Sequence, residues 1–220
     1  MESFKEWLTD QQLNPAELPP AELERLRRFY DELCATMPAR KEERFRDFFY
    51  DWGTQYYIAA RLAARAQLAP IHGNLFHHAV EMYLKGALVG TLTVAKMKQI
   101  QHRLPTLWDC FKEKETDPAL IRFDPTIEAL DEFELIRYPD KIVNEGMAVT
   151  IVWQPEHVTA FSDSAKSPPK YGVIIADIDN LVTEVVRRAS VNPKGLVSRI
   201  HGAAAREALA YQNPYAACWL

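Results

Sequence analysis

One short segment concentrates side chains that could do chemistry among apolar residues. Residues 73–90, which read GNLFHHAVEMYLKGALVG, place two histidines, a glutamate and a lysine on a pattern otherwise typical of a buried helix. These side chains are His77, His78, Glu81 and Lys85. Imidazole, carboxylate and ammonium groups at this spacing could exchange protons, hold a metal ion or bind an anion.

Helical geometry distinguishes between these chemistries. His77 and His78 are neighbours on a helix and point about 100° apart, so they cannot share one ligand face. His78 and Glu81 do share a face and form half of the metal site that helix bundles build from two facing pairs. No second His-x-x-Glu pair occurs in the chain. We therefore expect no metal and no other cofactor, and a hydrogen-bonded structural role for His78.

Glu81 and Lys85 stand four residues apart in the order that favours an ion pair on a helix. The ordinary interpretation is a solvated local pair. If the pair is partly buried, we predict that it joins Arg137 in a structural polar core, where losing one member would leave an uncompensated charge. Tyr138 and Asp140 follow Arg137 and are further candidates for the same polar or ligand-binding cluster.

Helical periodicity dominates the elements that must position these residues. The predicted helices cover residues 3–12, 20–36, 39–68, 73–90, 93–101, 105–114, 125–136, 176–190 and 195–210. Asp117-Pro118 and Asp124-Pro125 each predict a helix start, with a carboxylate cap followed by proline.

A β-branched stretch interrupts the helical pattern. AVTIVW at 148–153 predicts a strand, and YGVII at 171–175 is either its hairpin partner or the start of the next helix. The fold class is therefore mainly α, with a small β-hairpin insertion near 148–175.

No repeat or linker divides the chain, so we expect a single domain over 1–220. Within it, residues 1–38 form an N-terminal helical extension, 39–190 a bundle that carries the hairpin, and 191–220 a C-terminal helix and tail. A chain of 220 residues with 48% hydrophobic residues can bury one good core.

The overall charge argues against a protein that coats nucleic acid. The net charge is −4 at a pI of about 5.9, whereas phosphate binding normally needs a basic surface. A local basic patch without intervening acids is a candidate for nucleic-acid contact. It consists of Lys96, Lys98, His102 and Arg103.

Cysteine usage and the chain's start both predict a cytoplasmic protein. Cys34, Cys110 and Cys218 stand far apart without a CxxC motif, which suits a reducing compartment. The acidic N-terminus lacks the features of a signal peptide, and no segment has the apolar run of a membrane span, so we expect no membrane contact.

Three motifs, in this order, resemble the HEPN superfamily of helical bundles. They are A-x-E-x-x-x-K at Ala79, Glu81 and Lys85, then H-x-L at His102 and Leu104, then RYP at Arg137, Tyr138 and Pro139. The resemblance spans roughly residues 40–190. It implies four to five core helices, to which this chain adds N-terminal helices and the insertion.

The resemblance also implies a set of functions. Some HEPN proteins are metal-independent RNases that carry Arg-x4–6-His on a late helix, with two copies meeting at a dimer interface. Others are partners of nucleotidyltransferases, nucleotide-binding domains or structural subunits. Arg137 is followed by no histidine at the required spacing, and the pair Arg65 and His72 is separated by the helix breaker Pro70.

We therefore expect a non-catalytic prokaryotic binding protein. Its expected partners are a second copy of itself, a nucleotidyltransferase or other protein, and RNA or a nucleotide, in a toxin–antitoxin or defence role. The alternatives are a metal-independent RNase that uses Arg137 and His102 at an atypical site, and a purely structural helical subunit.

Two further constellations have ordinary structural interpretations. Asp177 and Asp179 lie about 200° apart on a helix and lack the preceding Gly-Ser turn of nucleotidyltransferases, so we expect a solvated helix start. An aromatic cluster predicts core or dimer interface, with base stacking as the alternative. Its members are Phe45, Phe48, Phe49, Trp52, Tyr56 and Tyr57.

Overall fold

The computed structural model describes residues 4–11, 13–15, 17–157, 170–198 and 200–220. The described chain is mainly helical with one two-stranded sheet, which confirms the predicted fold class. Contacts group it into two compact units, residues 1–44 and 45–220, so the boundary lies six residues beyond the extension predicted at 1–38. Among the described residues, no helix combines the length and the apolar character needed to cross a membrane.

The first unit contains α1 (Phe4–Asp10) and the N-terminal part of α2 (Pro20–Arg65). Aromatic rings hold the two helices together, with Phe4 5.4 Å and Trp7 5.6 Å from the ring of Tyr30. The helix starts at Pro20, as predicted. It then continues without interruption to Arg65, so the break predicted between residues 36 and 39 is wrong.

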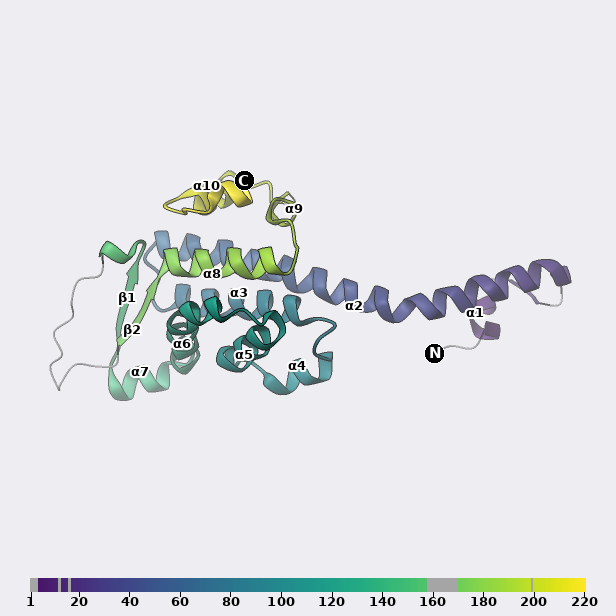
Figure 1. Ribbon diagram of the computed structural model, residues 1–220, viewed down its shortest axis with the longest axis horizontal. Coiled ribbons are helices and arrows are strands. Elements are labelled where there is room, and N and C mark those ends of the chain that lie inside the picture. The colour runs from purple at the N-terminus through teal and green to yellow at the C-terminus, as the bar shows by residue number, and fades with distance from the viewer. Residues whose placement is uncertain (1–3, 12, 16, 158–169, 199) are drawn as a thin grey trace. The chain divides into compact units, whose positions relative to one another are not determined.

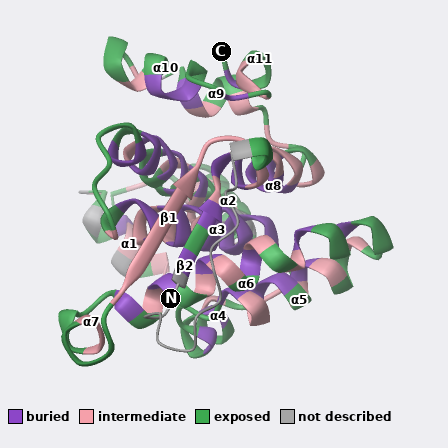
Figure 2. Cartoon of the chain, turned by 90° about the vertical axis from the view of Figure 1, so that its left-hand side faces the viewer, coloured by how far each residue is buried: buried purple, intermediate pink, exposed green. Residues whose placement is uncertain are grey.

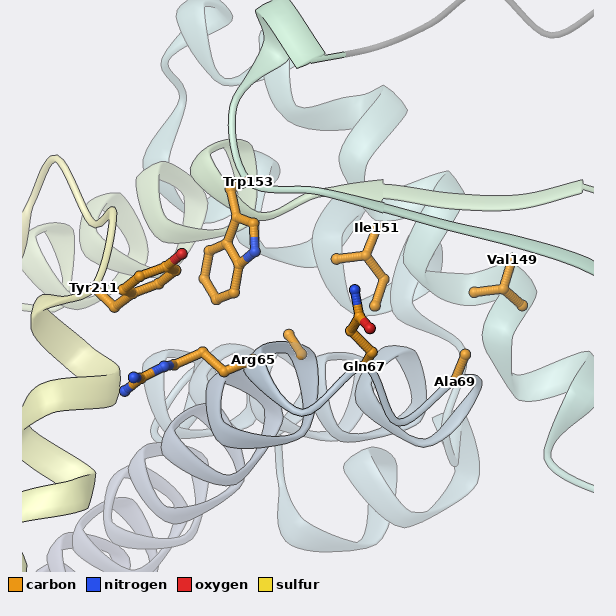
Figure 3. A pocket seen from close by; sticks show the side chains of 8 residues that line it. Arg65, Gln67, Ala69, Val149, Ile151, Trp153 and Tyr211 are labelled. Carbon is orange, nitrogen blue, oxygen red and sulfur yellow. The ribbon is translucent and has the colours of Figure 1, made fainter.

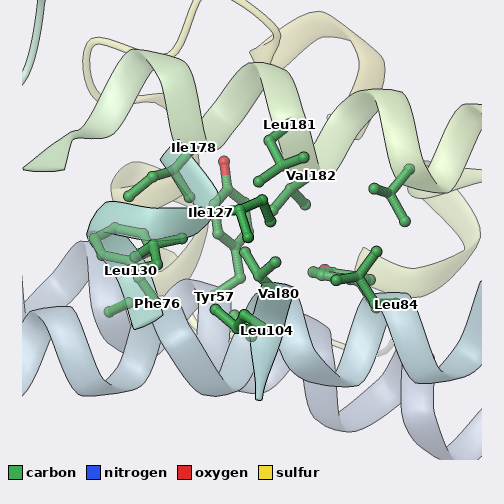
Figure 4. Close-up of a cluster of buried hydrophobic side chains, with 14 of the residues drawn as sticks. Tyr57, Phe76, Val80, Leu84, Leu104, Ile127, Leu130, Ile178, Leu181 and Val182 are labelled. Carbon is green, nitrogen blue, oxygen red and sulfur yellow. The ribbon is translucent and has the colours of Figure 1, made fainter. Parts of the chain in front are cut away.

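The second unit is built around α3 (Ile71–Leu88), most of whose residues are buried. This helix contacts α5 (Leu104–Glu115), α6 (Asp124–Glu132) and α8 (Ile175–Arg188), and α8 runs beside the C-terminal part of α2 (Figure 1). Apolar side chains from these helices meet in one core (Figure 4), and each buried Leu or Ile contributes roughly 1.5–3 kcal/mol. The bundle therefore holds α3 from several sides.

Close packing around α3 depends on small residues. A Cβ atom at Gly73 would lie 2.0 Å from the ring of Phe133, and one at Gly86 would lie 3.1 Å from the ring of Tyr50. The helix ends at Leu88, and Gly90, two residues later, has φ 86°, the left-handed conformation that favours glycine.

The remaining elements follow the predicted order with local differences. They are α4 (Val94–Ile100), η1 (Pro118–Phe123), η2 (Phe133–Ile136), α7 (Pro139–Glu145), η3 (Pro155–His157), α9 (Pro193–Val197), α10 (Ala203–Ala210) and α11 (Ala216–Trp219). Figure 2 shows the buried positions on the inner sides of the bundle helices, whereas α7 has no buried residue. The helix predicted at 195–210 is divided into α9 and α10.

One of the two predicted aspartate caps is present and the other is wrong. The Asp117 carboxylate accepts a hydrogen bond from the Ala119 amide at 2.9 Å and caps η1. Asp124 makes no cap, because its carboxylate is engaged by Trp108 Nε1 at 2.6 Å and by Lys112 Nζ at 3.0 Å.

The two strands form the small sheet expected near 148–175. β1 (Ala148–Val152) pairs with β2 (Lys170–Ile174) in register from Ala148 and Lys170 onward, but the strands run in parallel, so the segment is not a hairpin. A parallel pair needs a connection of about a dozen residues or more, which residues 153–169 supply. β2 leads directly into α8 at Ile175, so YGVII is a strand that ends as the helix begins.

Candidate ligand-binding site around Glu81

Glu81 on α3 is a fully buried carboxylate at the centre of a polar cluster. Lys85 Nζ donates to Glu81 Oε1 at 2.5 Å and to the carbonyl oxygen of Gln101 at 3.0 Å. His78 Nδ1 lies 3.2 Å from Glu81 Oε2, and His102 Nδ1 lies 3.1 Å from both carboxylate oxygens. Residues of the A-x-E-x-x-x-K motif and of the H-x-L motif therefore meet at the Glu81 carboxylate.

Glu81 remains ionised in this setting. Burial alone would raise its pKa, but the hydrogen bonds from His78, Lys85 and His102, together with the Lys85 charge, lower the pKa of Glu81 to about 2. A carboxylate only accepts hydrogen bonds, so the Nδ1 atoms of His78 and His102 carry the protons. Nε2 is then the ring atom of each imidazole that is left for a ligand.

A strained turn brings His102 to Glu81. Gln101, after α4, has φ 58° and ψ −120°, a conformation that costs a non-glycine residue about 1–3 kcal/mol. The Lys85 hydrogen bond to the Gln101 carbonyl stabilises this turn. On the other side, the amide of the buried Leu104 donates to Asp131 Oδ1 at 3.0 Å and fixes the start of α5.

His77 faces a different neighbour from His78, as helical geometry predicts. Its Nδ1 lies 3.1 Å from the Leu130 carbonyl oxygen, and its buried Nε2 has no partner among the described residues. Burial lowers the pKa of His77, which keeps it neutral. The ligand atoms of His77, His78 and Glu81 nevertheless lie within 4.8 Å of one another, so the prediction that the two histidines cannot share one ligand face is wrong. The Lys85 ammonium competes with any metal cation for the carboxylate.

Aromatic rings extend this cluster across the surface. The Tyr56 ring lies 5.5 Å from His78, His78 lies 5.8 Å from His102, and Phe48 lies 6.4 Å from Trp52. Phe48, Trp52 and Tyr56 are 51%, 53% and 37% exposed, respectively, whereas Tyr57 is buried. Core therefore describes only part of the cluster that was predicted to form core or dimer interface. We call the five residues Phe48, Trp52, Tyr56, His78 and His102 the ring row.

Two hollows border the ring row and share Trp52. One of about 400 Å³ is lined by Trp52, Gln55, Tyr56, Ala59 and Leu75. The other, of about 430 Å³, is lined by Phe45, Phe48, Phe49, Trp52, Lys85, Val94, Met97 and Lys98. The predicted basic patch thus contributes Lys98 to a hollow and His102 to the Glu81 cluster, whereas Lys96 and Arg103 are exposed nearby in the chain.

Arg137 does not join the Glu81 pair as predicted. Its Nη1 donates to Glu134 Oε1 at 3.1 Å, because the end of η2 brings these side chains together. The hydrogen bond that Arg137 donates to Glu134 raises the pKa of Arg137, and the Glu81 charge adds to this effect. Tyr138 is 68% exposed and Asp140 is exposed, so neither belongs to a buried polar core. His102 takes the place predicted for Arg137.

Asp179, which the sequence predicted to be solvated, lies at the centre of a second polar cluster. It is fully buried rather than solvated, pairs with Arg61 Nη1, and accepts a hydrogen bond from Tyr57 Oη at 2.5 Å. Burial raises the pKa of Asp179, although the Arg61 charge acts against this. Helical spacing put Asp179 on the face of Val182 and Val186, a signal that was present in the sequence.

Arg61 connects this second cluster to the C-terminal segment. Its Nε donates to the Ala208 carbonyl oxygen at 2.7 Å, and its Nη2 donates to the Tyr211 carbonyl oxygen. Asn213 Nδ2 donates to Tyr57 Oη at 3.4 Å. The cluster therefore anchors α10 and the residues after it to α2 and α8.

Comparison with known proteins finds no family model that matches the chain, and no curated protein or solved structure that is significantly similar to it.

Proposed function

We propose that this chain is a HEPN-like binding protein that takes single-stranded RNA along the ring row and does not itself cleave it. The observation that carries the proposal is the continuity of exposed aromatic rings with two imidazoles beside lysines. Bases stack on aromatic side chains with about 1–3 kcal/mol each, with little dependence on sequence. Lys98 and its basic neighbours supply the charge that phosphates need.

The contacts of Glu81 support binding rather than cleavage. Both nearby imidazoles use Nδ1 to hold the carboxylate, and Lys85 neutralises it. Arg137, which the RNase alternative needs beside His102, is paired with Glu134. The cluster therefore holds two imidazoles in fixed positions, where their Nε2 atoms can accept hydrogen bonds from bases or ribose hydroxyls.

A metal-independent RNase is the second candidate, and the 5.8 Å between the rings of His78 and His102 favours it. Two adjacent imidazoles can act as general base and general acid on a ribose phosphate. Incubation with unstructured RNA in a chelator, at high protein excess, separates the candidates. Cleavage that is lost in His102→Ala would replace binding with catalysis as the function.

Fluorescence anisotropy with a labelled oligouridylate tests the binding surface. We expect Trp52→Ala to weaken binding about tenfold or more, because one stacking platform is lost. Tyr138→Ala is the matched control, since Tyr138 is an exposed aromatic outside the ring row. Equal affinities for wild type and Trp52→Ala, or an equal loss in Tyr138→Ala, would contradict the proposal.

A protein partner is the competing occupant of an exposed aromatic surface. Light scattering of wild type and Trp52→Glu distinguishes it from RNA. A dimer that dissociates in Trp52→Glu, together with no RNA binding by the wild type, would assign the ring row to self-association instead.

A further inference from the structure

A third cavity lies between the end of α2 and β1 and shares no lining residue with the two hollows of the ring row. Its volume is about 580 Å³, within the range of small-molecule sites. It is lined by Ala64, Arg65, Gln67, Ala69, Val149, Ile151, Trp153 and Tyr211 (Figure 3).

One wall of this cavity is aromatic and held in place. The rings of Trp153 and Tyr211 meet at 81° with centroids 4.8 Å apart. The buried Arg61 guanidinium lies 5.4 Å from the Trp153 ring, and Gln154 Nε2 donates to the Gln212 carbonyl oxygen at 3.1 Å. These contacts tie β1 to the C-terminal segment, so the wall is already arranged for a flat ligand.

The strand supplies the apolar side of the cavity. Val149, Ile151 and Trp153 alternate along the chain and therefore point to the same face (Figure 3). Ala64 and Ala69 lie opposite with small side chains, which leaves the space open. A planar ring would bury its faces against these residues.

Two polar groups reach the same cavity. The Arg65 guanidinium lies 4.9 Å from the Tyr211 ring, and its Nη2 is 2.8 Å from Glu207 Oε1. The Glu207 side chain is 66% exposed, so this ion pair is weak and an incoming carboxylate can replace it. Gln67, with φ 57°, turns its amide toward Ile151 (Figure 3).

We propose that this cavity binds a planar aromatic carboxylate. The ring packs beside Trp153 and the strand residues, the carboxylate takes both donors of the Arg65 fork, and the Gln67 amide hydrogen-bonds a ring substituent. This site is independent of RNA binding at the ring row.

Calorimetric titration with indole-3-carboxylate and its neutral analogue indole-3-carboxamide tests the assignment. We expect the carboxylate to bind about tenfold tighter than the amide, since a charged bidentate hydrogen bond is lost in the amide. Arg65→Met should abolish this preference. Glu207→Gln should strengthen carboxylate binding several-fold and leave amide binding unchanged, because the internal competitor is removed.

Arg187→Met is the matched control, since Arg187 is an exposed arginine that pairs with Glu184 away from the cavity. It should leave both affinities unchanged. No binding of either compound at millimolar concentration, equal binding of both, or an unchanged preference in Arg65→Met would overturn the proposal. Trp52→Ala should not affect these titrations, so failure here and failure of RNA binding are distinguishable.

Discussion

His102 Nδ1 lies 3.1 Å from the Glu81 carboxylate, although 21 residues separate the two in the chain. Glu81 is fully buried while the His102 side chain is about half exposed, so the pair links the interior of α3 to the surface. The strained Gln101 turn makes the contact possible. A buried ionised carboxylate thus fixes the orientation of a surface imidazole.

Removing the Glu81 charge should destabilise the protein strongly. Glu81→Gln leaves the buried Lys85 ammonium without its counter-ion, and we expect a loss of about 3–5 kcal/mol in the free energy of unfolding. Urea denaturation measures this. The exposed pair of Glu22 and Arg25 provides the control, and Glu22→Gln should cost less than about 1 kcal/mol. A loss below that level in Glu81→Gln would contradict a buried ion pair.

Stability should fall in two stages as the pH is lowered. His72 and His77 have folded pKa values lowered from 6.5 by burial, so below pH 6.5 the unfolded chain binds protons that the folded chain does not. The pKa of Glu81 is about 2 in the folded chain and 4.5 in the unfolded chain. Its contribution to the free energy of unfolding is therefore complete above pH 4.5 and is lost as the pH falls toward 2.

Urea midpoints between pH 8 and pH 3 test this dependence. Glu81→Gln should flatten only the part of the curve below 4.5. An unchanged slope there would mean that Glu81 is not held ionised by its neighbours.

Relieving the strained turn should stabilise the fold. Gln101→Gly suits φ 58° and ψ −120° and keeps the carbonyl that Lys85 binds, so we expect a gain of about 1 kcal/mol. Gln99→Gly, at an exposed position in α4, is the matched control and should cost about 1 kcal/mol. Thermal denaturation of both variants provides the comparison, and a destabilised Gln101→Gly would rule out a strained turn.

Breaking the Asp179 pair should loosen the C-terminal segment. Asp179→Asn leaves the buried Arg61 guanidinium without its counter-ion, with an expected cost of about 3–5 kcal/mol. Trypsin should then cleave faster after Arg206 in α10. Asp177→Asn removes a partly buried carboxylate from the same helix and should cost less than about 1 kcal/mol. Equal cleavage rates in the two variants would contradict the anchoring role.

Local pattern alone accounts for most helices and for the burial of α8. Ile178, Leu181 and Val182 recur at helical spacing, and all three are buried in α8. The same spacing covered Asp179, but a charged residue is normally solvated, and only its long-range partners Arg61 and Tyr57 explain its burial. The Glu81 and Lys85 pair is buried, which their spacing alone left open, and the predicted third member, Arg137, pairs with Glu134 instead.

Sequence by itself therefore determined the helical class, the strand positions and the residue types of the Glu81 cluster. These follow from periods of 3.6 and 2 residues, which depend on neighbours in the chain. Tertiary structure decided the parallel pairing of β1 and β2, the contact of His102 with Glu81 and the cavity beside Trp153. Each of these joins segments that are far apart in the chain, and the packing of the whole bundle selects them over other pairings with equal local geometry.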